Sequence, residues 1–566
     1  MNVLGLHMGH DSSSVLIQDG SLTADVAEER FTRIKHYNGI PYAGLEYCLR
    51  EGNIPIEDVD VVAVSSRFPV PGLNYLFDLN EQQREKKNFR SQALDAYRKY
   101  FGGNQRMPPL YIKRHKLSSR TRIVHVEHHV AHAGSAYYSS GLGRDEKALI
   151  VTCDGMGDGW SVCIWRGENG RITPLKKFGT NGSLGWFYSN VTEALGWIHG
   201  DGEGKTMGLA PYGDAEKCRG CLDAFYPKYA SGDLVEPYDF GSVYYWDECG
   251  SAQFHFDDAD KIRRLIDRHG RENIAAEAQR VLEEQLVALI TYWLEKEKTD
   301  ILCAAGGVFL NVKLNQRLWC SGKIRKHWTY PNCGDSGLAY GAAMAAWFEE
   351  NSGDLPLLGD LYSGPAFGNE EIRTMLEHRR IPAEYVENIE DETAELLAQN
   401  KIVGWFQGRM ESGPRALGAR SILMSAGCLE NKDTINARVK YREGFRPFCP
   451  SMPIECAPQY LVKFRPEPFM ITSFDAAPGK RDGIPAVVHQ DGTARPQTVV
   501  RDTNTRYWTL LRRYGELSGH PVLLNTSMNI MGEPIVCNPR DAIKCFFDSG
   551  MDALALGNFL LTKRDL

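Results

Sequence analysis

The pattern with the clearest chemistry is a pair of histidines, His128 and His132, in a segment of good helical propensity (residues 127–138). Residues four apart lie on one face of a helix, so the two imidazoles can converge on one metal ion. The alternative is that both are ordinary histidines of an apolar helix. A zinc-peptidase site is excluded, because Glu127 precedes the pair and the pattern His-Glu-x-x-His is absent.

Two carboxylates extend this pair. Asp154 and Asp335 each follow an apolar or aromatic stretch and lie in glycine turns, Cys-Asp-Gly-Met-Gly and Cys-Gly-Asp-Ser-Gly. If both strand ends reach the same cleft, two histidines and two aspartates form a mixed nitrogen and oxygen ligand set. Such a set favours iron, manganese or zinc over calcium, and the ligand types do not choose among these three metals.

A glycine turn, Gly306 and Gly307, follows another apolar run and leads to Asn311. Glycines let the backbone approach a nucleotide closely and leave N–H groups free for phosphate. An ordinary tight turn is the alternative. Residues 202–206 resemble the end of a P-loop, but His199 stands where that motif requires glycine, so we do not assign a Walker motif.

Basic residues recur among small and aromatic ones in the C-terminal third of the chain. Arginines in glycine-rich loops suit bidentate phosphate binding, and several together suit a polyanion such as ATP. A solvated charged face is the alternative. The residues are Arg409, Arg415, Arg420, Lys440, Arg442, Arg446 and Arg495.

The elements that position these residues are strands and helices in alternation. Apolar runs at residues 3–6 and 15–17 precede Asp19-Gly20, which is a hairpin signal. A second strand is predicted at residues 148–152, as expected if two similar half-domains are present. Apolar residues at helical spacing predict a long helix over residues 273–297, followed by a buried strand at residues 301–305.

A change of composition marks a domain boundary. Residues 351–369 are rich in Gly, Pro and Asp, which is typical of a linker. Beyond it, strands at residues 402–406 and 522–524 alternate with helical stretches. We therefore expect an α/β domain over residues 1–350 and a second α/β domain over residues 370–566.

Composition excludes several functional classes. The chain has 566 residues with 65 Lys+Arg against 72 Asp+Glu, a net charge of −7, and so lacks the basic character of a dedicated nucleic-acid binder. It has no apolar run of about 18 residues and no secretory leader, so no membrane contact is expected. Its 14 cysteines are dispersed, as in reduced cytoplasmic proteins. The expected location is the cytoplasm.

Five motifs resemble one family, the O-carbamoyltransferases, which include the nodulation-factor, cephamycin and tobramycin enzymes. The resemblance extends from Val3 to about Leu560, with the motifs in family order. They are His10-Asp11-Ser12, residues 28–36 (Glu-Glu-Arg-Phe-Thr-Arg-Ile-Lys-His), residues 203–213, residues 412–418 (Ser-Gly-Pro-Arg-Ala-Leu-Gly) and residues 525–529 (Asn-Thr-Ser-Met-Asn).

The resemblance implies a fold and a reaction. The N-terminal domain would belong to the actin, sugar-kinase and heat-shock (ASKHA) superfamily and be like the threonylcarbamoyl-transfer protein. The C-terminal domain would be YrdC-like and make carbamoyladenylate from carbamoyl phosphate and ATP, with Mg²⁺, releasing pyrophosphate. The N-terminal domain would then pass the carbamoyl group to a hydroxyl of a small-molecule acceptor, a sugar or a natural product such as an antibiotic precursor.

The resemblance also implies roles for residues. His10 would be the general base on the acceptor hydroxyl, and Lys35 would lie at the acceptor and nucleotide site. His128, His132, Asp154 and Asp335 would hold the metal, Fe²⁺ by analogy or another divalent transition metal. The residues expected to bind ATP and carbamoyl phosphate are Arg415, Lys440, Arg446, Arg495, Asn525 and Ser527, together with the glycine-turn residues Gly306, Gly307 and Asn311. The short turn His7-Met8-Gly9 departs from the tobramycin enzyme, so that enzyme's acceptor preference is not carried over.

Two other functions use the same fold. One is a tRNA-modifying enzyme of the threonylcarbamoyl type, against which the acidic balance argues. The other is a catalytically inactive nucleotide-binding regulator, against which the intact set of His, Asp, Lys and Arg residues argues.

Overall fold

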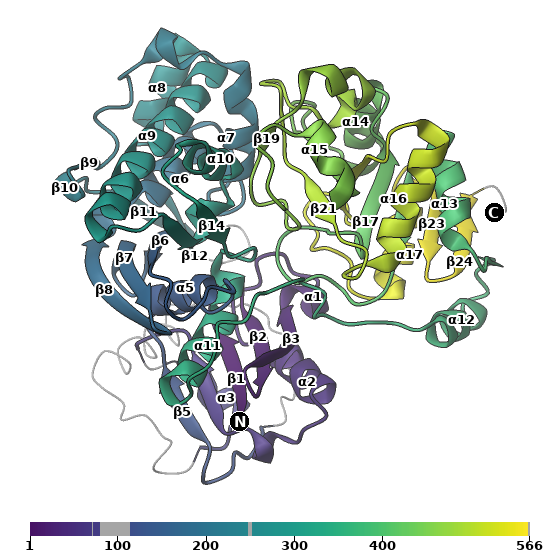
Figure 1. Ribbon diagram of the computed structural model, residues 1–566, viewed down its shortest axis with the longest axis horizontal. Coiled ribbons are helices and arrows are strands. Elements are labelled where there is room, and N and C mark those ends of the chain that lie inside the picture. The colour runs from purple at the N-terminus through teal and green to yellow at the C-terminus, as the bar shows by residue number, and fades with distance from the viewer. Residues whose placement is uncertain (69, 71, 80–113, 247–251, 564–566) are drawn as a thin grey trace. The chain divides into compact units, whose positions relative to one another are not determined.

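The computed structural model describes residues 1–68, 70, 72–79, 114–246 and 252–563, and divides the chain into two compact units (Figure 1). The first unit comprises Met1–Glu28, Tyr37–Leu310 and Ser321–Leu357. The second comprises Glu29–His36, Asn311–Cys320 and Leu358–Leu566. Two short segments that precede residue 350 therefore belong to the second unit. That residues 1–350 and 370–566 form two independently folding domains stays a prediction.

The first unit contains two five-stranded sheets of the same topology. In one, the order is β3-β2-β1-β4-β5, with antiparallel pairing from β1 to β3 and parallel pairing from β1 through β4 to β5. Its strands are β1 (Asn2–His7), β2 (Ser13–Gln18), β3 (Ser21–Ala27), β4 (Val61–Val64) and β5 (Arg122–His125). The predicted Asp19-Gly20 turn joins β2 to β3.

The second sheet repeats this plan in the order β8-β7-β6-β13-β14. Its strands are β6 (Ala148–Gly157), β7 (Trp160–Glu168), β8 (Arg171–Gly179), β13 (Ile301–Ala305) and β14 (Lys326–Thr329). The expected duplication of two similar half-domains is confirmed. One detail differs from prediction: β6 continues past Thr152 to Gly157, because its pairing with β7 resumes at Gly157.

Two helices lie between the two sheets (Figure 1). α5 (His128–Tyr137) packs on β6 and β13, and α11 (Leu338–Glu350) packs on β1, β2 and α5. The contact is close because Gly341 has no side chain: a Cβ there would lie 1.8 Å from the Ala131 carbonyl oxygen. This packing places the N-terminal end of α11 next to the first turn of α5.

Further helices and two hairpins complete the first unit. The predicted helix over residues 273–297 is confirmed as α9 (Arg271–Glu297). The other helices are α2 (Tyr42–Glu51), α3 (Leu73–Leu76), α6 (Leu184–Ala194), α7 (Glu203–Leu209) and α8 (Ala259–His269), and the hairpin strands are β9 (Lys228–Ala230), β10 (Asp233–Glu236), β11 (Ser242–Trp246) and β12 (Ala252–Phe256).

The second unit is built on an eight-stranded mixed sheet, β15-β24-β23-β16-β17-β22-β18-β21. The strands predicted at residues 402–406 and 522–524 are confirmed as β16 and β22, so both units are α/β as expected. The strands are β15 (Glu384–Tyr385), β16 (Val403–Phe406), β17 (Arg420–Ser425), β18 (Cys449–Pro453), β21 (Gln497–Val499), β22 (Leu523–Ser527), β23 (Ala553–Leu556) and β24 (Phe559–Thr562), with a separate pair β19 (Phe474–Asp475) and β20 (Thr493–Ala494).

The helices of the second unit cover this sheet with two apolar clusters. α13 (Ile389–Ala398) and α16 (Thr505–Ser518) pack together, and α17 (Pro539–Phe547) packs on β16 and β23. The remaining helices are α1 (Glu29–Thr32), α10 (Val312–Cys320), α12 (Asn369–His378), α14 (Glu430–Ile435) and α15 (Ala457–Tyr460). Of the described helices, none has both the length and the apolar character needed to cross a bilayer.

Candidate functional site

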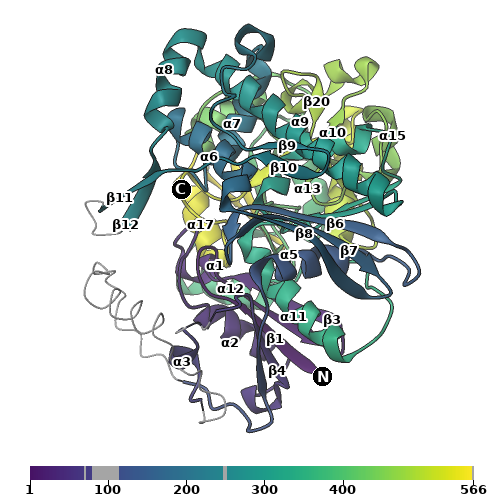
Figure 2. The same ribbon diagram turned by 90° about the vertical axis from the view of Figure 1, so that its left-hand side faces the viewer.

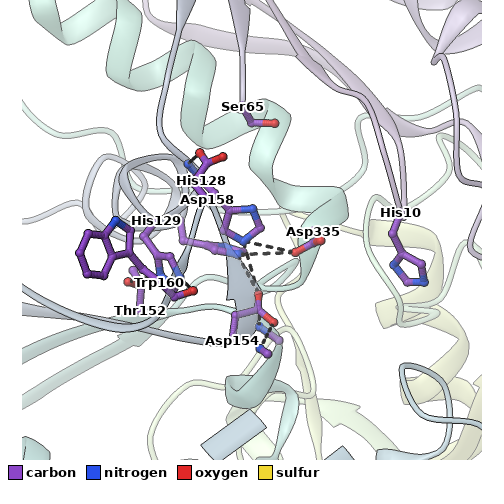
Figure 3. Close-up of polar contacts among 12 residues, drawn as sticks. His10, Ser65, His128, His129, Thr152, Asp154, Asp158, Trp160 and Asp335 are labelled. Atoms are coloured by element: carbon purple, nitrogen blue, oxygen red, sulfur yellow. Dashed lines mark hydrogen bonds and ion pairs between the residues drawn. The ribbon is translucent and has the colours of Figure 1, made fainter. Parts of the chain in front are cut away.

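The structure brings together the four residues of the predicted metal set, all in the first unit (Figure 3). His132 Nε2 lies 3.0 Å from Asp154 Oδ2 and 3.7 Å from Asp335 Oδ1. His128 Nε2 lies 3.8 Å and 3.7 Å from the same two oxygens. One ligand atom from each residue lies within 4.8 Å of all the others. We call these four residues the His–Asp cluster.

The local fold explains this convergence. His128 is the first residue of α5, and its backbone N–H donates to Asp158 Oδ2 at 2.8 Å, which fixes the start of the helix. Its ring lies against Gly157, where a Cβ would stand 2.0 Å from His128 Cδ2. Asp154 lies on β6, and Asp335 precedes α11. A strand of the second sheet, helix α5 and the turn before α11 thus supply one ligand set.

Charge pairing sets the protonation of the His–Asp cluster. Burial lowers the pKa of His132, but the hydrogen bond to Asp154 and the charge of Asp335 outweigh it and raise that pKa to about 9. Burial likewise raises the pKa of Asp154, but the two histidines hold it well below its usual range.

The cluster fits a divalent transition metal. Among the described residues, His128 Nε2 is buried without a hydrogen-bond partner and faces the two carboxylates. Two imidazole nitrogens and two carboxylate oxygens are a ligand set that suits iron, manganese or zinc. The intervening His129 faces away, bonding Thr152 Oγ1 at 2.9 Å and the Trp160 carbonyl at 3.0 Å (Figure 3).

The first turn contains one histidine that sequence reasoning did not select. His7 is buried at the end of β1, its Nδ1 2.8 Å from Ser65 Oγ and its Nε2 2.9 Å from the His10 carbonyl oxygen. Burial lowers the pKa of His7, although Asp335 opposes this, so the ring is neutral and its Nε2–H donates to that carbonyl. His10 itself stands apart from the His–Asp cluster in Figure 3, with its Nδ1 3.0 Å from Asp11 Oδ2. Nothing in the spacing distinguishes His7 from an ordinary strand residue.

The glycine turn divides between the two units. The Gly307 N–H donates to Asp154 Oδ2 at 3.2 Å, and Gly306 packs against Cys153, so both glycines adjoin the His–Asp cluster. Asn311 is part of the second unit, and its Oδ1 accepts the Leu314 N–H at the start of α10. Nucleotide binding by these three residues stays a prediction.

Arg442 and Arg446, two of the basic residues noted in the sequence, lie near Lys440. This buried lysine ends a π-helical turn (Asn436–Lys440), and its Nζ donates to the Ser527 carbonyl at 2.5 Å, the Asn529 carbonyl at 3.0 Å and Asn529 Oδ1 at 2.7 Å. Burial, and then Arg442, Arg446 and Lys35, hold the pKa of Lys440 well below its usual range.

Arg442 shows the same crowding of positive charge. Burial, followed by Arg446 and Arg495, lowers the pKa of Arg442 to about 9. Cations that depress each other's pKa values are stabilised by a bound anion. We call Lys35, Lys440, Arg442, Arg446 and Arg495 the cation cluster. Arg442 was noted in the sequence but was not among the residues assigned to the nucleotide.

A loop of the second unit carries Arg415 and is held by buried side chains. Glu411 Oε1 accepts the backbone N–H groups of Leu417 at 2.6 Å, Ala419 at 3.3 Å and Arg420 at 3.2 Å. Asn525, predicted to bind nucleotide, is buried and donates to the Ala416 carbonyl at 3.2 Å. Its Oδ1 has no hydrogen-bond partner within the described parts of the chain, so a ligand contact by Asn525 stays a prediction.

Comparison with known proteins decides the family. A model of the carbamoyltransferase N-terminus matches residues 2–344, and a model of the carbamoyltransferase C-terminus matches residues 394–563. The chain belongs to the carbamoyltransferase family. It is therefore a transferase, and the two matched regions correspond to the two α/β regions that were predicted.

Relatives of this carbamoyltransferase match it along nearly its whole length. Nodulation protein NolNO of Sinorhizobium fredii is 34% identical over 98% of this chain and 79% of its own length. An uncharacterized protein of a Synechocystis species is 33% identical over 98% of this chain and 95% of its own. Among solved structures, full-length HypF in its phosphate- and nucleotide-bound form overlaps 62% of this chain and 56% of its own, at 13% identity and a TM-score of 0.30. That likeness is too slight to carry an argument.

Proposed function

We propose that this carbamoyltransferase works through two half-reactions. In the second unit, water hydrolyses carbamoyl phosphate to carbamate and inorganic phosphate. A carbamate oxygen then attacks the α-phosphorus of ATP and displaces pyrophosphate, which gives carbamoyladenylate. In the first unit, the hydroxyl of a sugar or another small natural product attacks the carbamoyl carbon, and AMP leaves.

The observation that carries this proposal is the cation cluster. Burying like charges together is unfavourable unless a counter-ion offsets them. In addition to burial, Arg442, Arg446 and Lys35 lower the pKa of Lys440, and Arg446 and Arg495 lower that of Arg442, so a bound polyanion would stabilise both side chains. ATP with Mg²⁺ and carbamoyl phosphate supply that negative charge, and guanidinium groups match phosphate oxygens in geometry.

The transfer step would use the first turn and the His–Asp cluster. A neutral imidazole can accept a proton from a hydroxyl as the new C–O bond forms, so we assign this role to His10. Asp11, 3.0 Å from His10 Nδ1, would orient the ring, and His7 would hold the His10 carbonyl. His128, His132, Asp154 and Asp335 would hold the metal, iron by family resemblance, which when bound acts as a Lewis acid toward phosphate or carbonyl oxygen.

The first experiment needs no acceptor. Purified protein is incubated with ATP, Mg²⁺ and carbamoyl phosphate, and pyrophosphate release is followed, with carbamoyl phosphate omitted as the control. Release that depends on carbamoyl phosphate supports the first half-reaction and opens a screen of hydroxylated metabolites. No release from metal-loaded protein contradicts the proposal, and bicarbonate with threonine would then test the tRNA-modification alternative.

A further inference from the structure

A segment from the N-terminal part of the sequence forms part of the second unit. Residues 29–36, here called the strap, include α1 and follow directly on Glu28 of the first unit. In Figure 2, α1 lies beside α17 of the second unit. The strap thus contributes Lys35 to the cation cluster and belongs to the same unit as Lys440, although 404 positions of sequence (440 − 36) separate its last residue from that lysine.

One end of the strap contacts the loop that carries Arg415. Arg30 Nη2 donates to the Gly413 carbonyl oxygen at 2.8 Å. The Arg30 side chain is 6% exposed, and its Nη1 lies 2.7 Å from Glu29 Oε1. Gly413 and Arg415 belong to the loop that Glu411 closes. A buried guanidinium bonded to a backbone carbonyl fixes the path of that loop rather than the position of one side chain.

The other end contacts the loop that holds Lys440. Arg33 Nη1 donates to the Ile535 carbonyl at 2.6 Å, and Nη2 donates to the Pro534 carbonyl at 2.8 Å. Asn529, which accepts from Lys440, donates its own Nδ2 to the Glu533 carbonyl at 2.6 Å. The loop from Ser527 to Ile535 is therefore held at one end by Lys440 and at the other by Arg33.

The strap is held by a hydrogen bond between its two ends and by apolar packing. Glu29 Oε2 accepts the His36 N–H at 2.8 Å, which closes the strap on itself. Phe31 packs against the buried side chains of Met410, Ile535 and Cys537. The two arginines therefore project from one packed body onto two different loops.

We propose that Arg30 and Arg33 are positioning residues of the anion-binding site. Together they fix the position of the loop that carries Arg415 relative to the loop from Ser527 to Ile535, which binds Lys440. This inference rests on the proposed function of the second unit. Neither arginine needs to touch substrate. Displacing a binding group by about 1 Å can lower a rate on the order of 100-fold. Losing the hydrogen bonds of either arginine should therefore lower the catalytic rate more than the stability of the fold.

The test uses the full chain and the carbamoyl-phosphate-dependent release of pyrophosphate. We expect Arg30→Ala and Arg33→Ala to lower kcat/KM for ATP by about 10- to 100-fold. Arg30→Lys, which keeps a cationic donor, should recover part of the loss. Millimolar guanidinium should restore part of the Arg30→Ala rate without shifting its unfolding midpoint, which a merely structural role would not allow. Arg513→Ala, at an exposed arginine of the same unit, is the matched control and should match wild type.

The outcomes separate the two proposals. If wild-type protein releases no pyrophosphate, the proposed function fails. If wild type is active and folded Arg30→Ala and Arg33→Ala match its kcat and KM, the positioning role is wrong. Should either alanine variant not fold, Arg30→Gln and Arg33→Gln replace it. If Arg30→Gln and Arg33→Gln have the kcat and KM of wild type, the inference is also wrong. If their kcat/KM is reduced and that of Arg30→Lys lies between Arg30→Gln and wild type, the inference is supported.

Discussion

The Glu411 carboxylate accepts the backbone N–H of Leu417 at 2.6 Å and so closes the loop that carries Arg415. The same oxygen also accepts from Ala419 and Arg420. One buried side chain thereby replaces the backbone partners that a helix or sheet would otherwise supply to this loop.

Removing that carboxylate should be costly. Hydrogen bonds to a charged group contribute about 1.5–3 kcal/mol each, and unpaired buried N–H groups add a further penalty. We expect Glu411→Ala to lower the free energy of unfolding by about 3 kcal/mol and Glu411→Gln by less, because the amide oxygen still accepts. Urea denaturation measures both. Equal stability of Glu411→Ala and wild type would show that the loop does not depend on this residue.

The His–Asp cluster predicts a metal requirement in one half-reaction only. We expect Asp154→Asn and Asp335→Asn to lose bound transition metal in elemental analysis, while Asp300→Asn, at an exposed aspartate, keeps it. Carbamoyl transfer to an acceptor should fall by at least about 100-fold in the first two variants, since a Lewis acid is lost. Pyrophosphate release should persist in all three. Retention of the metal in both cluster variants would contradict this assignment.

Glu28 predicts a pH dependence of stability. Its carboxylate accepts the Ala43 and Gly44 N–H groups, yet burial dominates and raises the Glu28 pKa from 4.5 to about 7. A raised pKa favours the protonated native state, so this contribution is full below pH 4.5 and is lost as pH rises through about 7. The free energy of unfolding should therefore fall by about 3 kcal/mol across that window. Urea titrations at pH 5 and pH 8 should show this fall in wild type and a smaller fall in Glu28→Gln. An equal fall in both proteins would show that Glu28 is not its source.

Local patterns predicted the elements that build the sites. Helical spacing located α9, the Asp-Gly dipeptide located the hairpin of the first sheet, and strand-end aspartates predicted the approach of Asp154 and Asp335 to His128 and His132. Each of these depends on residues close in sequence or on a rule about where strands end.

The features that escaped prediction depend on long-range packing. The strap and residues 311–320 join the second unit through contacts such as Arg33 to Ile535 and Asn315 to Ile471, which leave no periodic signal. The contact of the Asn525 amide nitrogen with the Arg415 loop also escaped prediction, since only the folded sheet shows which way the side chain turns; its contact with nucleotide stays a prediction. His7 likewise becomes noticeable only once β1 places it beside Ser65.

The most direct test of the two-site account assays each half-reaction separately in two variants. His10→Ala should leave carbamoyl-phosphate-dependent pyrophosphate release near wild type and reduce transfer from supplied carbamoyladenylate to an acceptor by about 100-fold or more. Arg446→Ala should do the opposite, losing about 100-fold in pyrophosphate release while still transferring from supplied carbamoyladenylate. This crossed pattern is the result we predict. Loss of the same half-reaction in both variants would contradict the division of the chemistry between the two units.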